Sequence, residues 1–505
     1  MSFMKSRIKS FIIKNWIIIL IWFLAFVVRI LASIFSKGFI HPDEHYQSIE
    51  IAYYEIYGEG YIPWEFEEGV RSWVYPGIVL LIFKLMIWIG VTNIETILIF
   101  VRLFSAFCSM ITVITIYFLG KDLFDERVGL VATIFVSFWS DFVFWSVRTM
   151  TDSITMHFAI LGIYIIVHYI TKPKKTNLTE EQISKNKKIE GIVPGLLAGL
   201  MFGLSFIFKF PTIILAFPFG LWLLIKKKWS AVSFLVIGIG IMVVVQGIVD
   251  VFTWGSFLQS PIGYFNYNIL TGQSENHGIS PFFTYPVLMF DAYGDFFIIF
   301  LLFFFFGLNK EKKNLWFLFS ALSFILVFSF IGHKEYRFIL PVMPLLVIFA
   351  AKGFLEYPIK INHNNIRKGI FVFFTIFTLG CSLGNTFYFR TFQPHNQLCQ
   401  SVKWVCEQED INHLIIVEDN LYNTPGFAYI TNNISYIYAS FIVDYYCGIY
   451  VHEQYYIIVS EPIYDEHFDY LNRIFDYRNI TLDETFEGTH WYYDPTILVF
   501  KNLVM

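Results

Sequence analysis

The segment His41-Pro42-Asp43-Glu44-His45-Tyr46-Gln47-Ser48-Ile49-Glu50 follows the first long apolar stretch of the chain and opens an acidic loop. Pro42 suits the first position of a helix, where its missing N–H is not needed. Asp43 and Glu44 then fall in the first turn, where the helix dipole favours negative charge. α-Helical spacing predicts one shared face for four polar side chains of the segment: Asp43, Tyr46, Gln47 and Glu50. Such a group could supply a general base for a hydroxyl acceptor, or it could be a solvated helix cap.

The composition places this loop in a membrane protein. The chain has 505 residues, of which 56% are hydrophobic and 15% charged, whereas about 25% of the residues of a soluble domain are charged. The net charge of −4 and the lack of a basic stripe argue against nucleic-acid binding. Five cysteines make neither a disulfide framework nor a metal signature. We therefore predict a polytopic, all-α membrane protein that needs no metal.

The basic residues predict the topology. Lys5, Arg7, Lys9 and Lys14 precede the apolar stretch 11–34, and positive residues stay in the cytoplasm, so the loop after this stretch is external. If the apolar segment 74–91 also crossed the membrane, the Lys-rich loop 172–188 would be external. We therefore predict that 74–91 is a juxtamembrane helix within a first external loop at 36–94.

About eleven transmembrane spans follow from this choice, several of them near the 20 residues that a bilayer requires. They are expected at 11–34, 96–119, 127–146, 152–171, 191–208, 211–225, 230–252, 286–308, 315–332, 337–352 and 368–388. Residues 390–505 alternate short β-type runs with polar helical stretches, which predicts a small external α/β domain behind a transmembrane catalytic domain at 1–389. Asn433 and Asn479 head sequons in this tail.

A second polar cluster lies between two apolar spans, at His333, Lys334 and Arg337. Charges at a membrane boundary are costly and usually have partners or a function. Three potential cations could hold a lipid-linked phosphate, with arginine making bidentate contact; interfacial snorkelling is the alternative. Pro341 and Pro344 predict a broken helix beside this cluster.

Other external residues could contact a substrate. Trp64, Glu65 and Arg71 could stack on a sugar and fix the loop, or belong to an aromatic belt. Asp152 is expected to cap the next helix, with Arg148 as its partner. The sequence has no P-loop, H-E-x-x-H, G-x-S-x-G or C-x-x-C motif, which removes the main support for an ATP pump or a zinc protease.

Several motifs resemble one family. Residues 38–50 resemble the first-loop motif of the GPI-anchor mannosyltransferases that add the third and fourth mannose. These belong to the lipid-phosphate-mannose-dependent α-mannosyltransferases of glycosyltransferase family 22, which have the multispan GT-C fold. Residues 333–338 resemble the family's late H-K-E-x-R-F motif, and 148–152 resemble its R-x-x-T region. The resemblance runs over about residues 10–390 and does not include the tail. Residues 274–286 lack the family's His-Pro-Trp-rich segment, which leaves the acceptor open.

The resemblance implies an inverting transfer of mannose from polyprenyl (dolichyl) phosphate mannose to a glycolipid acceptor such as a GPI precursor. Asp43 would be the base, with Glu44 second, and His333, Lys334 and Arg337 would hold the leaving phosphate. Substrate-binding residues would be His41, Gln47, Trp64, Glu65, Arg71, Arg148 and Asp152. No cofactor beyond the lipid-linked sugar is expected.

The site would face the lumen of the endoplasmic reticulum in a eukaryote, or the outside of the plasma membrane in a prokaryote. Three alternatives stay open: a lipid-linked glycan transporter or flippase, a transferase of another sugar such as glucose or arabinose, and a non-catalytic subunit of a glycosylation complex.

Overall fold

A computed structural model describes most of the chain. The described residues are 2–171, 190–273, 275, 278–293, 296–308, 314–356, 395–409, 411–418, 424–430, 434–439, 443, 454–478, 480–487 and 495–502. The predicted span 368–388, the loop 172–188, Asn433 and Asn479 lie outside them.

The chain forms two compact units, and neither is a continuous segment. The first, which we call the membrane unit, comprises Met1–Ser33, Glu68–Tyr75 and Arg102–Gly384. The second, the loop–tail unit, comprises Ile34–Glu67, Pro76–Val101 and Asn385–Met505. Most of the loop at 36–94, which the sequence predicts to be external, is thus grouped with the tail, whereas Glu68–Tyr75 belongs to the membrane unit.

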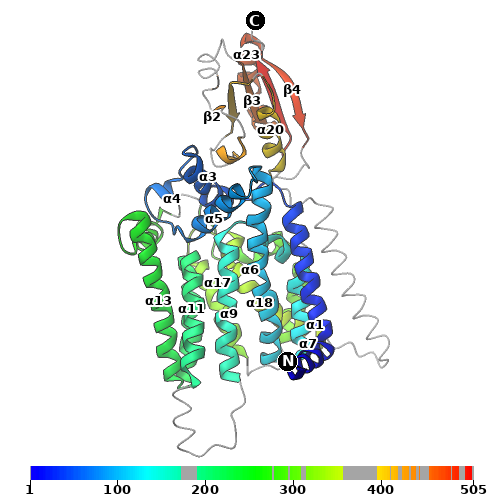
Figure 1. Cartoon of the computed structure of the whole chain (residues 1–505), viewed down its shortest axis with the longest axis vertical. Helices are drawn as coiled ribbons and strands as arrows, with labels where there is room; N and C mark the ends of the chain where they lie inside the picture. Colours follow the sequence, from blue (N-terminus) through cyan, green and yellow to red (C-terminus); the bar gives the residue numbers. More distant parts are fainter. Residues whose placement is uncertain are drawn as a thin grey trace, which may run out of the picture. The chain divides into compact units, whose positions relative to one another are not determined.

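Helices dominate the membrane unit (Figure 1). They are α1 (Ser2–Phe35), α6 (Ile94–Leu123, which begins in the loop–tail unit), α7 (Glu126–Phe138), α8 (Ser140–Trp145), α9 (Thr151–Thr171), α11 (Ile192–Phe208), η2 (Phe210–Leu215), α12 (Ala216–Ile225), α13 (Trp229–Trp254), α14 (Gln259–Phe265), η3 (Asn266–Leu270), α15 (Thr284–Tyr293), α16 (Phe296–Leu308), α17 (Leu315–Ser329), η5 (Tyr336–Val342) and α18 (Met343–Glu356). Helices α9, α11 and α13 run side by side. Glycines permit the closest approach, because a Cβ on Gly199 of α11 would clash with Leu235 of α13.

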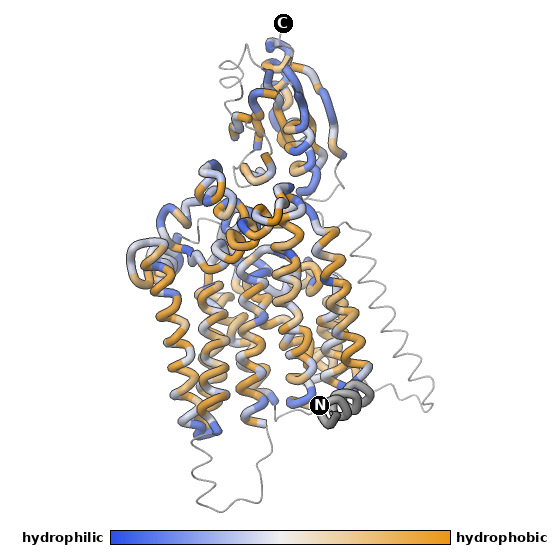
Figure 2. The backbone as a smooth tube through the Cα atoms, in the orientation of Figure 1, coloured by the Kyte–Doolittle hydropathy of each residue, from blue (hydrophilic) through white to orange (hydrophobic). Residues whose placement is uncertain are grey.

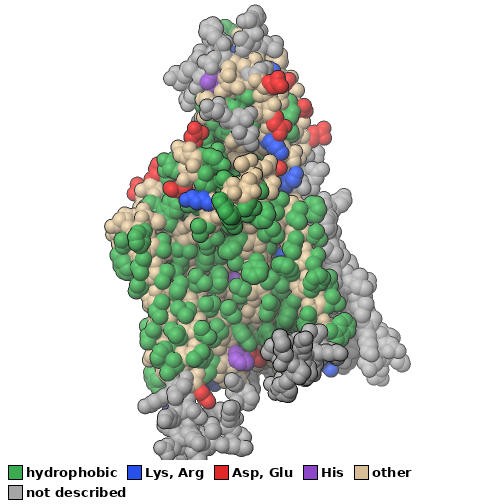
Figure 3. Space-filling model, in the orientation of Figure 1, with side chains coloured by type: hydrophobic (Ala, Val, Ile, Leu, Met, Phe, Trp, Pro, Cys, Tyr) green, Lys and Arg blue, Asp and Glu red, His purple; other side chains and the backbone are tan. Residues whose placement is uncertain are grey.

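The face of these helices that Figures 2 and 3 show is largely apolar. Phe107, Phe217 and Phe252 are all more than 60% exposed, as lipid-facing side chains are. Within the described residues, five helical stretches are long and apolar enough to cross a membrane, and a sixth if the pair α15 and α16, bent by 117°, is one span. The total of about eleven spans therefore remains a prediction from the sequence. The juxtamembrane position of α5 (Val74–Trp88) also remains a prediction.

A buried arginine binds the carbonyls where the predicted span 127–146 is broken. Helix α7 ends at Phe138 and Trp139 is extended, so the last carbonyls of α7 lack helical partners. Arg29 of α1 donates to the carbonyl oxygens of Val136 (3.0 Å) and Ser137 (2.9 Å) and to Oγ of Ser109 on α6 (2.9 Å). One side chain therefore joins three helices and satisfies a broken helix end within the apolar core.

The described part of the tail combines helices with a small sheet. Its elements are α20 (Asn396–Cys406), β1 (His413–Val417), η7 (Phe427–Tyr429), β2 (Ser435–Ala439), β3 (Tyr455–Ser460), α22 (Glu461–Glu466), α23 (Phe468–Arg478), β4 (Ile480–Phe486) and β5 (Ile497–Asn502). The sheet has the order β2-β1-β3-β5-β4; β1 is parallel to β2 and β3, whereas β5 is antiparallel to β3 and β4. Strands rich in branched residues pack on α22 and α23 around Ile457 and Phe475.

We expect Arg29→Met to destabilise the membrane unit by about 2–4 kcal/mol, because it leaves the carbonyls of Val136 and Ser137 without a donor in an apolar core. The measurement is the thermal unfolding midpoint of the protein in detergent. Arg127→Met, which replaces an exposed arginine in the first turn of α7, is the matched control. Equal midpoints for the two variants would contradict the capping role.

Candidate active site

The helix that begins at Pro42 gives the acidic segment its local geometry. His41 caps α2 (Pro42–Glu44): its Nδ1 accepts the N–H of Asp43 at 3.1 Å. The Asp43 carboxylate lies 3.7 Å from the same ring nitrogen and is 25% exposed. Glu44 is buried, and its Oε2 accepts the N–H of Ile40 at 2.9 Å. The two adjacent carboxylates thus differ in exposure: Glu44 is buried and holds the loop, whereas Asp43 is accessible to solvent.

A π-helical turn follows, which corrects one prediction. Residues His45–Ile49 form η1, a π-helix, before α3 (Glu50–Tyr57) resumes α-helical geometry. The α-helical spacing that predicted a shared face for Asp43 and Glu50 is therefore interrupted. Insertion of a π turn is common at functional sites, and nothing in the residue types of this segment signalled it.

Glu50 is the anchor of the loop–tail unit. Its carboxylate is fully buried and accepts the backbone N–H groups of Phe427 (2.9 Å), Ala428 (3.2 Å) and Tyr61 (3.1 Å), and it lies 3.1 Å from Nε2 of His45. A carboxylate that accepts several N–H groups is strongly held. Glu50 therefore fastens the first loop to the start of η7 in the tail.

Two further contacts reinforce this junction. The Tyr46 hydroxyl lies 2.7 Å from Oγ1 of Thr424 and 3.2 Å from its carbonyl oxygen, and Phe39 stacks on His395. Gln47 donates to Glu65 of α4 (Trp64–Glu67) at 2.8 Å. The structure thus brings the predicted residues Gln47, Glu65 and Trp64 into one folded loop.

In the membrane unit, Asp152 lies where three segments meet: the start of α9 and two interruptions of apolar helical segments. This residue lies in the first turn of α9. One carboxylate oxygen binds Nζ of Lys209, which lies between α11 and η2, and the other lies 3.9 Å from the guanidinium of Arg337 in η5. All three side chains are at most one-tenth exposed. Desolvated charges require such compensation.

Glu335 organises the second half of this network. It accepts two hydrogen bonds from Arg337 (2.6 and 2.8 Å) and one from Nε2 of His333 (2.9 Å). The hydrogen bond to Glu335 raises the pKa of His333 above its ordinary value, although burial opposes the shift. The ring of Phe338 lies beneath both Lys209 (4.6 Å) and Arg337 (5.3 Å). Three cationic side chains of the cluster, Lys209, Arg337 and His333, thus face two carboxylates, Asp152 and Glu335, and a third carboxylate, Asp141, accepts the hydroxyl of Tyr336 in η5 at 2.6 Å.

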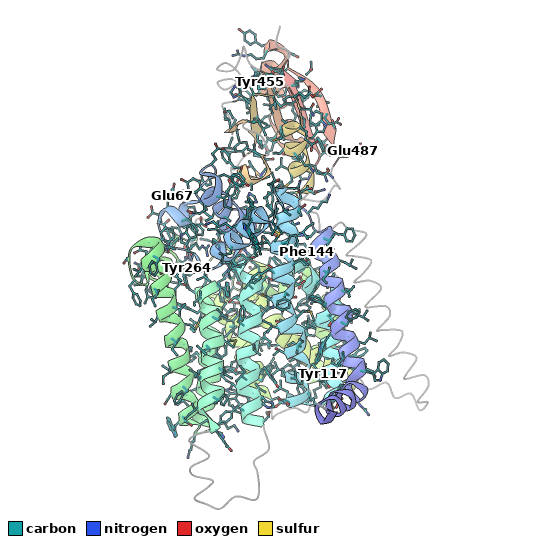
Figure 4. All side chains as sticks on the ribbon, in the orientation of Figure 1. Glu67, Tyr117, Phe144, Tyr264, Tyr455 and Glu487 are labelled. Carbon is teal, nitrogen blue, oxygen red and sulfur yellow. The ribbon has the colours of Figure 1, made fainter. Side chains whose placement is uncertain are left out.

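The other predicted residues have mixed placements. Lys334 donates to the carbonyl oxygens of Ser280 (2.8 Å) and Ile331 (2.6 Å), so it ties two loops together. Arg148 is buried with its guanidinium 4.4 Å from the Phe144 ring, and Arg71 lies 5.6 Å from the Tyr264 ring; Figure 4 labels both aromatic residues. Arg71 also lies within electrostatic range of Lys209.

Two members of the network, Lys209 and Glu335, were not predicted as site residues. Lys209 had a signal: it is a single lysine between apolar stretches, two residues before Pro211. Among the described residues no cluster of three or more His, Cys, Asp or Glu side chains could hold a metal ion.

The fold defines the class of protein. The chain is similar to ArnT from Cupriavidus metallidurans, with TM-scores of 0.64 for the apo state and 0.60 for the structure titled as bound to undecaprenyl phosphate. Sequence identities are 12% and 11%, and coverage is 97% and 96% of this chain and 98% of each ArnT chain. The likeness shows the GT-C membrane fold.

The sequence defines the family. The profile of the Alg9-like mannosyltransferase family matches residues 20–431, well over half of the chain, so the chain belongs to that family. It is 27% identical over 340 residues to GPI mannosyltransferase 3 of Candida albicans and 24% identical over 354 residues to GPI alpha-1,2-mannosyltransferase 3 of Homo sapiens. Each match covers 66% of this chain, but only 64% and 57% of those relatives' own length.

We expect Gly426→Ala to open the junction that Glu50 makes. Gly426 has φ +63°, and a Cβ there would lie 2.6 Å from Oε2 of Glu50 and 2.8 Å from Nε2 of His45. The amides of Phe427, Ala428 and Tyr61 should exchange hydrogen for deuterium roughly tenfold faster or more, as expected when about 1–3 kcal/mol of local stability is lost.

Gly58→Ala is the matched control, because Gly58 has φ +70° and a Cβ there would meet no other atom within 4 Å. It carries the same backbone strain without the clash. Equal acceleration of exchange in both variants would show that strain, and not the Glu50 contact, governs the junction.

Proposed function

We propose that this protein transfers mannose from a polyprenyl (dolichyl) phosphate donor to a hydroxyl of a lipid-linked glycan such as a GPI precursor, with inversion to an α-linkage. Family membership over residues 20–431 carries the proposal. The names of the relatives support the sugar and the acceptor class. The ArnT structure titled as bound to undecaprenyl phosphate supports the donor class. As part of this proposal the membrane is that of the endoplasmic reticulum, which the GPI mannosyltransferase names of the relatives support, and the site faces the lumen.

Asp43 is the proposed base for the acceptor hydroxyl. It is partly exposed, whereas Glu44 and Glu50 are buried in contacts that hold the loop. A carboxylate at a helix start is stabilised in its charged form, so it would act mainly by orientation of the acceptor. His41, Gln47, Trp64 and Glu65 would shape the acceptor side of this loop.

The cations of the membrane unit would hold the donor phosphate. Arg337 and His333 are the first choices, and Lys209 joins them because it lies beside Phe338 and Asp152. Lys334 donates to main-chain carbonyls, so its contribution would be the position of the loop. Arg71, Arg148 and Asp152 would complete the surroundings of the phosphate.

Asp43→Asn should abolish most transfer, by roughly 10²–10⁴-fold, because the amide cannot accept the acceptor's proton. Purified protein in lipid is offered polyprenyl-phosphate mannose beside a nucleotide-mannose, with a panel of glycolipid acceptors. Asp125→Asn is the control, since Asp125 only caps α7 and asparagine also caps helices. Transfer that survives in Asp43→Asn would move the base to another carboxylate, and transfer from the nucleotide sugar would refute the donor class.

The affinity for the lipid donor should fall as the pH rises through the pKa of His333. Because this pKa is raised in the folded protein, the imidazolium and its pairing persist on the acid side and are lost on the alkaline side. The donor phosphodiester keeps one charge throughout this range. We expect KM for the donor to rise about tenfold, which corresponds to one charge-assisted hydrogen bond.

Glu335→Gln tests the cause of this pH dependence. Without the carboxylate, the pKa of His333 should fall toward the ordinary value for histidine. The rise of the donor KM with pH should therefore occur at a lower pH in this variant than in wild type. An unshifted limb would assign the titration to a group other than His333.

A further inference from the structure

The hydroxyl of Tyr285 is buried without an internal partner. Tyr285 lies in the first turn of α15, its side chain is 1% exposed, and its oxygen makes no hydrogen bond within the described part of the protein. Nearly all buried polar side-chain atoms in native proteins are hydrogen-bonded. An isolated buried hydroxyl is costly, so such a group calls for a ligand that supplies its partner.

Three packed elements place Tyr285 beside the cation cluster. Helices α9 and α15 both pack against η5, which carries Arg337, and α9 carries Asp152. The N–H of Ser280 donates to the carbonyl of Gly332 at 2.9 Å, and Lys334 donates to the carbonyl of Ser280 at 2.8 Å. The segment that leads into Tyr285 is therefore pinned to the loop that leads into Glu335.

The electrostatic surroundings indicate the kind of ligand. Tyr285 lies within electrostatic range of the carboxylates of Glu335 and Asp152, and a phenol is a neutral O–H donor at physiological pH. Those carboxylates are already engaged by Arg337, His333 and Lys209. An anionic oxygen drawn in by the cations is the acceptor that gains most from a neutral O–H donor.

We propose that Tyr285 is a further substrate-contacting residue, whose hydroxyl donates a hydrogen bond to a phosphate oxygen of the lipid donor. The inference rests on the proposed function and deepens it. In the transfer, the acceptor oxygen bonds to the anomeric carbon and gives its proton to a base. The bond from that carbon to the phosphate oxygen breaks, and its electron pair stays on the phosphate, whose charge goes from −1 to −2. A donor at this oxygen stabilises the transition state more than the ground state.

The test is Tyr285→Phe, which removes only the oxygen. We expect kcat/KM for polyprenyl-phosphate mannose to fall about 10- to 100-fold, close to the range for loss of one such donor. The thermal midpoint should stay equal or rise, because an unsatisfied polar atom has been removed, and KM for the acceptor should not change. Tyr464→Phe is the control: it removes a hydroxyl that donates to Asn472 in the tail, and its transfer rate should equal that of wild type.

Binding of polyprenyl phosphate alone separates this inference from the proposed function. Titration of the full-length protein with polyprenyl phosphate should raise the thermal midpoint of wild type and raise that of Tyr285→Phe less. This result would support the contact even if no mannose transfer were found. Equal protection of both proteins, unchanged kcat/KM, or a loss confined to the acceptor KM would each overturn it and make Tyr285 a core residue.

Discussion

The pairing of Asp152 with Lys209 and Arg337 is the constraint on which the membrane unit depends. Three charges lie where one helix begins and two apolar segments are interrupted. Irregular backbone within an apolar layer is tolerated only where its polar groups find partners, and desolvated charges must be paired. The breaks and the charges therefore require each other. At the end of α7, the buried charge of Arg29 is held in a different way, by hydrogen bonds to main-chain carbonyls and without a carboxylate.

Glu50 has the corresponding role in the loop–tail unit, with different chemistry. It is a buried carboxylate that accepts three backbone N–H groups, two of which come from the tail. The family profile matches as far as residue 431, beyond the predicted limit of the resemblance near residue 390, and its last residues include the turn that Glu50 holds. The tail thus folds together with the first loop. Gly426 is required at their contact because only a residue without Cβ fits against Glu50 and His45.

The sequence predicted the elements that are encoded by residues close together in the chain. It did not predict the interactions between residues that are far apart in the chain. The helix start at Pro42, the strands at 414–417 and 455–459, and the GT-C membrane class all follow from residue type, periodicity and motif resemblance. The π turn at His45–Ile49 does not, and the contacts that Tyr46 and Glu50 make beside it join them to Thr424 and Phe427, which lie 378 and 377 residues further along the chain. Lys209 and Arg29 carry charge within apolar stretches, a recognisable signal, but the carboxylate and the carbonyls that they bind lie 57 and more than 100 residues away.

The acidic residues of the first loop differ in burial, and this difference indicates which of them hold the fold. Glu44, Glu50 and Glu65 accept hydrogen bonds that fold the first loop, whereas Asp43 is partly exposed, which is why Asp43 is the carboxylate proposed to act on the acceptor. Under the proposed mechanism Asp43 would act mainly by orienting the acceptor hydroxyl. In the proposed transfer, most of the stabilisation would come from donors that meet the charge developing on the leaving phosphate, because preorganised donors have a large effect there. Arg337, His333 and Lys209 are preorganised in this sense, because Glu335, Asp152 and the ring of Phe338 hold them before any substrate binds.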